Sequence, residues 1–270
     1  MRMLLLLFCA CGLPAAAPTV EPPPPVAEPM PAAPPPPTWP ASSAGLTLLS
    51  EPAAGPHILL DPGHGAPKNA GNTSVRCEQE QVVMLRLAQR LEAPLKEREL
   101  KVQLSRQDHT VSYDVRLKKS ASFDAMISLH SDARAGLGWM PGPQGCWQTV
   151  GAAGMAILYS DEGETSLVEA RLSLARAVAL RMASVGFLMY SGSDYSGLYD
   201  PDQVAGVFVD RHIPAQRIRL LRRPVVPSII IETHDSHDVE EAARWEEEAT
   251  VQAFAGALAA GIADWRAPQK

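Results

Sequence analysis

Basic charge is scarce in this chain of 270 residues, which has 24 Lys and Arg against 30 Asp and Glu and a formal net charge of -6. Proteins that bind nucleic acid through its phosphates carry a basic surface, so this composition argues against a nucleic-acid partner. The one dense basic segment is "RIRLLRR" at residues 217–223. Such a run is typical of a solvated face, and attraction of an anionic polymer is the alternative.

Long hydrophobic runs are also lacking. The N-terminal segment "MRMLLLLFCACG" is too short to span a membrane, and residues 1–11 predict an export signal. Its "FCAC" segment resembles a bacterial lipobox, which would make Cys11 a lipidated N-terminus and a membrane anchor, although Phe8 stands where Leu is usual. A secretory signal cut near "PAAA" is the alternative. Both interpretations predict an exported protein of the periplasm or cell envelope.

Large apolar side chains are sparse in residues 12–50, where proline and alanine dominate. This composition predicts a disordered, semi-rigid linker. Residues 51–270 have the length of one α/β domain. They contain only two cysteines, Cys77 and Cys146, and we expect these to form a disulfide because an exported protein meets an oxidising compartment.

Short apolar segments alternate with helical patterns in this domain. The expected strands are residues 57–60, 101–104, 125–130 and 228–232, with a fifth near 155. Apolar residues at helical spacing predict helices over 83–95, 167–185 and 251–265. The pattern predicts a single α/β domain with a largely parallel sheet and helices on both faces, similar to phosphorylase and hydrolase folds. Residues 133–153 and 190–217 are expected to be long loops that form walls of a substrate groove.

Three expected strands end on residues that can bind a metal or move a proton. His64 follows "ILLDPG", His130 closes "AMISLH" and Glu232 closes "SIIIE". Because the carboxyl ends of parallel strands meet at one edge of a sheet, we expect the three to converge. Glu78 and Glu80 lie where the helix after His64 begins. Either they complement the helix dipole, or one completes a His, Glu, His set of the kind that holds catalytic zinc.

The order and spacing of these motifs resemble the zinc-dependent N-acetylmuramoyl-L-alanine amidases of the cell-separation and autolysin type, over residues 57–265. "ILLDPGHG" resembles the segment with the first zinc histidine, "EQVVMLRLA" the segment with the ligand glutamate, and "ISLHSD" the segment with the second zinc histidine. The resemblance implies Zn2+ bound by His64, Glu80 and His130, with Glu78 fitting only if the register shifts. "VPSIIIET" resembles the segment that ends in the catalytic glutamate, here Glu232.

Other segments match less closely. "LSRQDHTVSYDVR" resembles a family segment in which Arg106, Asp108 and Arg116 would be structural. After Glu232 the chain departs from the family pattern and reads "THDSHD". We regard Asp132 and His234 as candidates for the substrate pocket. His234 and His237 could also bind a second ion, and polar loop residues are the alternative for both.

The resemblance implies a peptidoglycan hydrolase that cleaves the amide between the lactyl group of N-acetylmuramic acid and L-alanine of the stem peptide. Zinc would activate water and Glu232 would be the general base. Two other interpretations are a non-catalytic peptidoglycan-binding lipoprotein with a degenerate amidase fold, and a zinc peptidase that cuts stem-peptide bonds. The need for an activator protein stays open.

Overall fold

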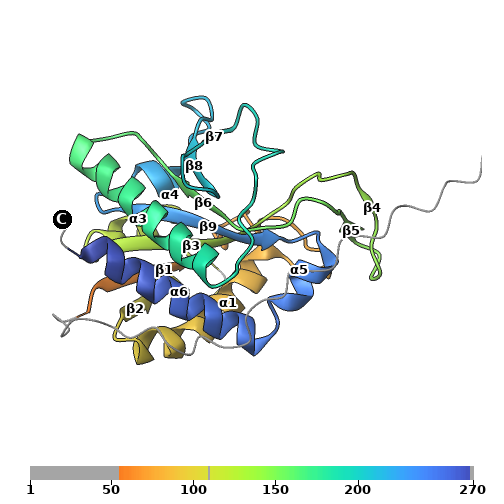
Figure 1. Ribbon diagram of the computed structural model, residues 1–270, viewed down its shortest axis with the longest axis horizontal. Coiled ribbons are helices and arrows are strands. Elements are labelled where there is room, and N and C mark those ends of the chain that lie inside the picture. The colour runs from red at the N-terminus through yellow and green to blue at the C-terminus, as the bar shows by residue number, and fades with distance from the viewer. Residues whose placement is uncertain (1–54, 109, 268–270) are drawn as a thin grey trace, which may run out of the picture. The chain divides into compact units, whose positions relative to one another are not determined.

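The computed structural model describes residues 55–108 and 110–267, and the predicted export signal, linker and Cys11 lie outside them. A seven-stranded sheet crosses the domain (Figure 1). In spatial order its strands are β2 (Lys101–Leu104), β1 (His57–Pro62), β3 (Ala125–Asp132), β9 (Ser228–Asp235), β6 (Ala156–Tyr159), β8 (Val207–Asp210) and β7 (Tyr199–Pro201). Within this sheet only the β9–β6 and β8–β7 pairs are antiparallel, so the predicted α/β fold with a largely parallel sheet is confirmed.

Helices cover both faces of this sheet. The main hydrophobic core lies between one face of the sheet and α1 (Glu80–Glu97), α3 (Thr165–Ser184) and α6 (Glu248–Arg266). A smaller core lies between the other face and α2 (Tyr113–Ser120) and α4 (Arg219–Arg222). Both faces need covering because successive side chains of a strand point to opposite faces, and residues 58–60 of β1 are all apolar. Ile58 and Leu60 lie in the main core, and Leu59 packs with Phe123 in the smaller core. The short α5 (Val239–Arg244) follows β9. None of the helices within the described residues is long and apolar enough to cross a bilayer.

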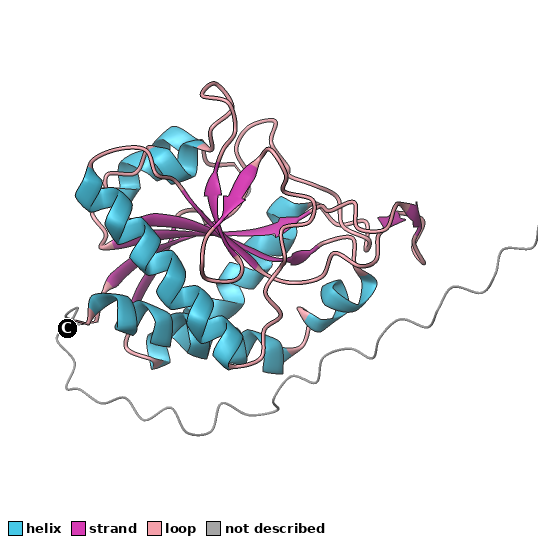
Figure 2. Ribbon diagram, turned by 45° about the horizontal axis from the view of Figure 1, so that its top comes forward, coloured by secondary structure: helices cyan, strands magenta, loops and turns pink. Residues whose placement is uncertain are grey.

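The two stretches expected to be loops contain additional strands. Residues 190–217 include β7 and β8, and residues 133–153 include a hairpin of β4 (Met140–Pro141) and β5 (Trp147–Gln148). These strands are only two to four residues long and lie among glycines and prolines, so they carry too little periodicity to be recognised. Figure 2 shows the small hairpin projecting beyond the end of the main sheet.

The segments that carry the candidate site residues meet at one edge of the sheet, where the parallel strands end. Strands β1, β3 and β9 are parallel, so their carboxyl ends meet there. Strand β6 is antiparallel to β9 and therefore begins at this same edge. The turn after β1, the start of α1 and the hairpin between β3 and β6 consequently lie close together.

Candidate metal centre

The turn after β1 places His64 in an unusual backbone conformation. Its φ angle is 56°, in the left-handed region that few residues other than glycine adopt. Two buried arginines hold this turn by its carbonyl groups: Arg106 donates to the carbonyls of Pro62 and Gly63, and Arg116 to those of Pro62 and His64. Both arginines thus act on the backbone of the turn, as expected for structural residues.

The imidazole of His64 is oriented by an amide. Asn69 Oδ1 lies 2.6 Å from His64 Nδ1 and also accepts from the backbone N–H of Gly71. Because this oxygen can only accept, Nδ1 of His64 donates this hydrogen bond, which fixes the orientation of the ring and turns Nε2 toward Glu80. That Nε2 lies 3.0 Å from Glu80 Oε2.

Glu80 begins α1, yet its carboxylate is buried rather than solvated. Oε2 accepts from the backbone and side-chain N–H groups of Asn72, and Oε1 accepts from the backbone N–H of Ser131. Burial alone would raise the pKa of Glu80, but hydrogen bonds from His130 and His64 outweigh it and hold the pKa well below its usual range. The charged carboxylate is therefore fixed in place between the two histidines.

His130 and Glu232 lie side by side on adjacent strands. They are paired in the β3–β9 register, so both side chains leave the same face of the sheet. The chain of Gly63 passes so close that a Cβ atom there would lie 2.7 Å from the His130 ring. Burial, and after it the negative charge of Asp132, raise the pKa of Glu232 to about 8. Within the described residues, the buried atoms His130 Nε2 and Glu232 Oε2 have no hydrogen-bond partner.

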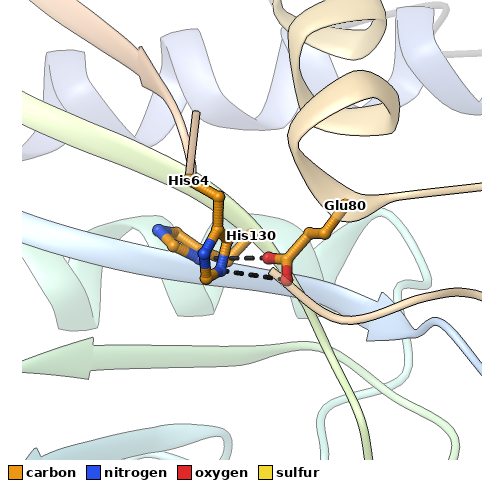
Figure 3. Close-up of side chains that lie close together, drawn as sticks. All are labelled: His64, Glu80 and His130. Atoms are coloured by element: carbon orange, nitrogen blue, oxygen red, sulfur yellow. Dashed lines mark hydrogen bonds and ion pairs between the residues drawn. The ribbon is translucent and has the colours of Figure 1, made fainter. Parts of the chain in front are cut away.

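These side chains make a donor set that suits a metal ion. His64, Glu80 and His130 converge with their potential ligand atoms within 4.8 Å of one another (Figure 3). Two imidazole nitrogens and one carboxylate oxygen are the ligands of many catalytic zinc sites, and the unpartnered His130 nitrogen fits that use. Glu78 does not face the histidines and forms a bidentate ion pair with Arg86. The structure thus brings Glu80, and not Glu78, to the histidines.

The structure places His234 on the other side of the sheet from Glu232. A bulge in β9 pairs Asp132 with Asp235, so one extra residue turns His234 away from the face that carries Glu232. Its ring stacks on Trp245 in the main core, and burial, with the Arg134 charge, lowers its pKa to about 3. In a strand without a bulge, His234 would point to the same face as Glu232. The bulge cannot be predicted from the sequence.

His237 is also buried, and Trp139 contacts its ring edge at 4.7 Å between centroids. Within the described residues, neither His234 nor His237 belongs to a group of three residues able to hold a metal, so a second ion site is not supported there.

Asp132, by contrast, stays near the candidate site in a polar network that the sequence did not reveal. Its Oδ2 accepts from the Tyr195 hydroxyl at 2.5 Å and from Arg134 Nε at 2.9 Å. Arg134 is buried and its guanidinium lies 3.7 Å from the centre of the Tyr190 ring. Tyr195 comes from the stretch expected to be a loop, which is why no periodic signal pointed to it.

Cys77 and Cys146 are joined in the structure by a disulfide with a Cα–Cα distance of 5.5 Å. Cys77 lies three residues before Glu80, so the bond ties the β4–β5 hairpin to the segment that leads into α1.

Comparison with known families agrees with this geometry. The model of the Amidase_3 family, described as N-acetylmuramoyl-L-alanine amidase, matches residues 58–264. The chain belongs to this family. The match includes His64, Glu80, His130 and Glu232.

Solved amidase structures share the fold. Ami1 of Mycobacterium smegmatis has a TM-score of 0.59 at 19% identity, with 78% of this chain and 97% of that chain covered. AmiC2 of Nostoc punctiforme has a TM-score of 0.53 at 21% identity, with 76% and 94% covered. An amidase of Clostridium difficile 630 has a TM-score of 0.54 at 21% identity, with 78% and 96% covered. Comparison with curated protein sequences gives no match.

Proposed function

We propose that this amidase is a zinc-dependent peptidoglycan hydrolase that cleaves the amide between the lactyl group of N-acetylmuramic acid and L-alanine of the stem peptide. The observation that carries the proposal is the convergence of His64, Glu80 and His130 at the sheet edge, with Glu232 paired to His130 on the next strand. Family membership supplies the bond that is cleaved.

In this proposal His64, Glu80 and His130 hold the metal. A bound zinc ion would polarise the scissile carbonyl and lower the pKa of a water molecule from 15.7 to about 7. The hydrogen bonds from Asn72 and Ser131 orient the Glu80 carboxylate, and the hydrogen bond to Asn69 orients the His64 ring.

We assign proton transfer to Glu232. Its carboxylate accepts the proton of the water that attacks the amide carbon, and donates that proton to the nitrogen as the C–N bond breaks. Burial supports this role by raising the pKa of Glu232 to about 8, close to the pH at which a general base has to work, and a nearby cation would bring it lower.

Digestion of purified sacculi tests the proposal, with mass analysis of the soluble products. We expect release of intact stem peptides that begin with a free L-Ala amine, inhibition by a chelator and recovery on addition of Zn2+. Shortened peptides would identify a stem-peptide peptidase instead. No release from sacculi by the zinc-loaded protein would identify a non-catalytic binding protein.

Export and lipidation at Cys11 are part of the same proposal, because the substrate lies outside the cytoplasmic membrane. Labelling with a fatty acid that is lost in Cys11→Ala would support the anchor, and an unlabelled wild-type chain would refute it.

A protein partner is a separate expectation. The related CwlD amidase of Clostridioides difficile was solved in complex with the GerS lipoprotein, and it matches this chain with a TM-score of 0.53 at 16% identity. Co-purification from envelope extracts would test whether this chain also has a partner.

A further inference from the structure

The β4–β5 hairpin has one exposed apolar face. Burial alternates along it, and the outward positions are Leu137, Trp139, Pro141 and Trp147, with exposed fractions of 82% for Leu137, 47% for Trp139 and 59% for Trp147. The half-buried positions between them are Met140, Gly142, Cys146 and Gln148. The register places Pro141 opposite Trp147, so these two side chains leave the same face of the hairpin. We call the four exposed side chains Leu137, Trp139, Pro141 and Trp147 the hairpin face. Contiguous exposed apolar surfaces on proteins are typical of binding sites.

Several bonds fix the hairpin on the domain. The Cys77–Cys146 disulfide holds its tip segment, and the backbone N–H of Thr149 donates to the carbonyl of His237 at its base. The Thr149 hydroxyl donates to the buried carboxylate of Asp235. The tryptophans are therefore presented on a rigid support, which lowers the entropy cost of binding through them.

The hairpin face is linked to the candidate metal centre through a short chain of contacts that includes the buried residues Ser236 and His237. The Trp139 ring contacts His237, and the neighbouring Ser236 donates its hydroxyl to Asn72 Oδ1 at 2.9 Å. Asn72 in turn donates its amide to Glu80 Oε2 at 2.9 Å. Only three contacts separate a metal-site carboxylate from Trp139, so the hairpin lies close enough for a polymer whose linkage is at the metal centre to reach it.

The chemistry of the hairpin selects among binding partners. Residues 135–160 contain no Asp, Glu, Lys, Arg or His, so recognition of a charged protein surface or of anionic lipid headgroups finds no ionic partner in this segment. Pyranose rings carry a face of C–H groups that packs on the negative face of an indole ring, and such contacts need no charge. Trp139, directly before β4, and Trp147, in β5, thus suit sugar rings of one glycan chain.

We propose that the hairpin face binds the glycan strand of peptidoglycan, with sugar rings stacked on Trp139 and Trp147, while a stem-peptide amide lies at the metal centre. This inference rests on the proposed function, since it extends the substrate of that site from one muramoyl-peptide linkage to the polymer that carries it.

The test compares the full-length wild-type chain with the double variant Trp139→Ala/Trp147→Ala on two substrates and one binding probe. On glycan strands stripped of stem peptides, we expect the double variant to bind about tenfold more weakly or worse. On sacculi its KM should rise by a similar factor, while kcat/KM for a soluble monomeric muramoyl-peptide stays within about twofold. The second result also shows that the variant is folded.

Two controls sharpen the comparison. Trp139→Phe/Trp147→Phe keeps aromatic rings and should retain most of the glycan affinity. Leu180→Ala removes an equally exposed apolar side chain, 58% accessible, from α3 and should change neither assay.

The outcomes separate this inference from the proposed function. Unchanged glycan binding by the alanine double variant overturns the inference even if stem peptides are still released from sacculi. If the alanine double variant loses binding to phosphatidylglycerol vesicles but keeps glycan binding, the inference is also overturned, and the hairpin face is a membrane contact instead. Tryptophan-dependent glycan binding by a wild-type chain that releases no peptide supports the inference and refutes the proposed activity.

Discussion

Replacement of Arg116 by methionine should destabilise the domain more than other single substitutions in α2. The guanidinium is fully buried, pairs with the buried carboxylate of Asp61 at 3.3 Å and donates to the carbonyls of Pro62, His64 and Val111. Methionine fills part of the volume but leaves the Asp61 charge without its cation. Breaking a buried pair in this way costs about 3–5 kcal/mol of unfolding free energy.

Urea unfolding followed by circular dichroism measures this cost, with the disulfide intact. Lys118→Met is the matched control, because Lys118 lies on the same helix but is exposed, and it should change stability by less than about 0.5 kcal/mol. Adding Asp61→Asn to Arg116→Met removes the unpaired charge and should restore part of the loss. A cost below about 1 kcal/mol for Arg116→Met alone would refute the reasoning.

The same substitution should weaken metal binding. Arg116 holds the carbonyl of His64, so its loss frees the turn that positions the imidazole. Competition with a chelator measures the affinity, and an unchanged affinity in a destabilised variant would show that the turn keeps its shape without this arginine.

Three other predictions concern the metal centre and the disulfide. Glu232→Gln should keep its zinc and its fold but lose about two to four orders of magnitude in peptide release, and loss of zinc would instead make Glu232 a ligand. Glu80→Ala should empty the metal site and Glu78→Ala should not, as measured by metal analysis after dialysis; the reverse pattern would contradict the geometry. Replacing both Cys77 and Cys146 by serine should lower the unfolding free energy by about 4 kcal/mol, because the bond closes a loop with a sequence separation of 69 residues, and unchanged urea midpoints would reject this estimate.

Much of the fold was visible in the sequence because long buried strands and amphipathic helices leave a strong periodic signal. Lys101–Leu104 and the start of α1 lie where the pattern predicted, and three strand ends brought His64, His130 and Glu232 to one edge. The hairpin did not have such a signal, because its strands are two residues long.

The direction of the His234 side chain could not be predicted from the sequence for a different reason. Alternation predicts the direction of a side chain only while the register is unbroken, and the bulge in β9 reverses it after Glu232. Asn72 and Tyr195 were missed because they act through contacts with Glu80 and Asp132 that are formed only in the folded chain. Nothing in their own sequence surroundings distinguishes them.

The direction of β6 has a consequence for how this enzyme scaffold can be altered. Because β6 begins at the edge where β3 ends, the chain passes between them without a crossover helix, and residues 133–155 have only to travel across that edge. A change of length at the exposed tip of the β4–β5 hairpin, between Pro141 and Cys146, therefore leaves the order of the strands in the main sheet unchanged. Exchange of this hairpin for another would change the surface beside the candidate metal centre while β1, β3 and β9 keep their places in the sheet.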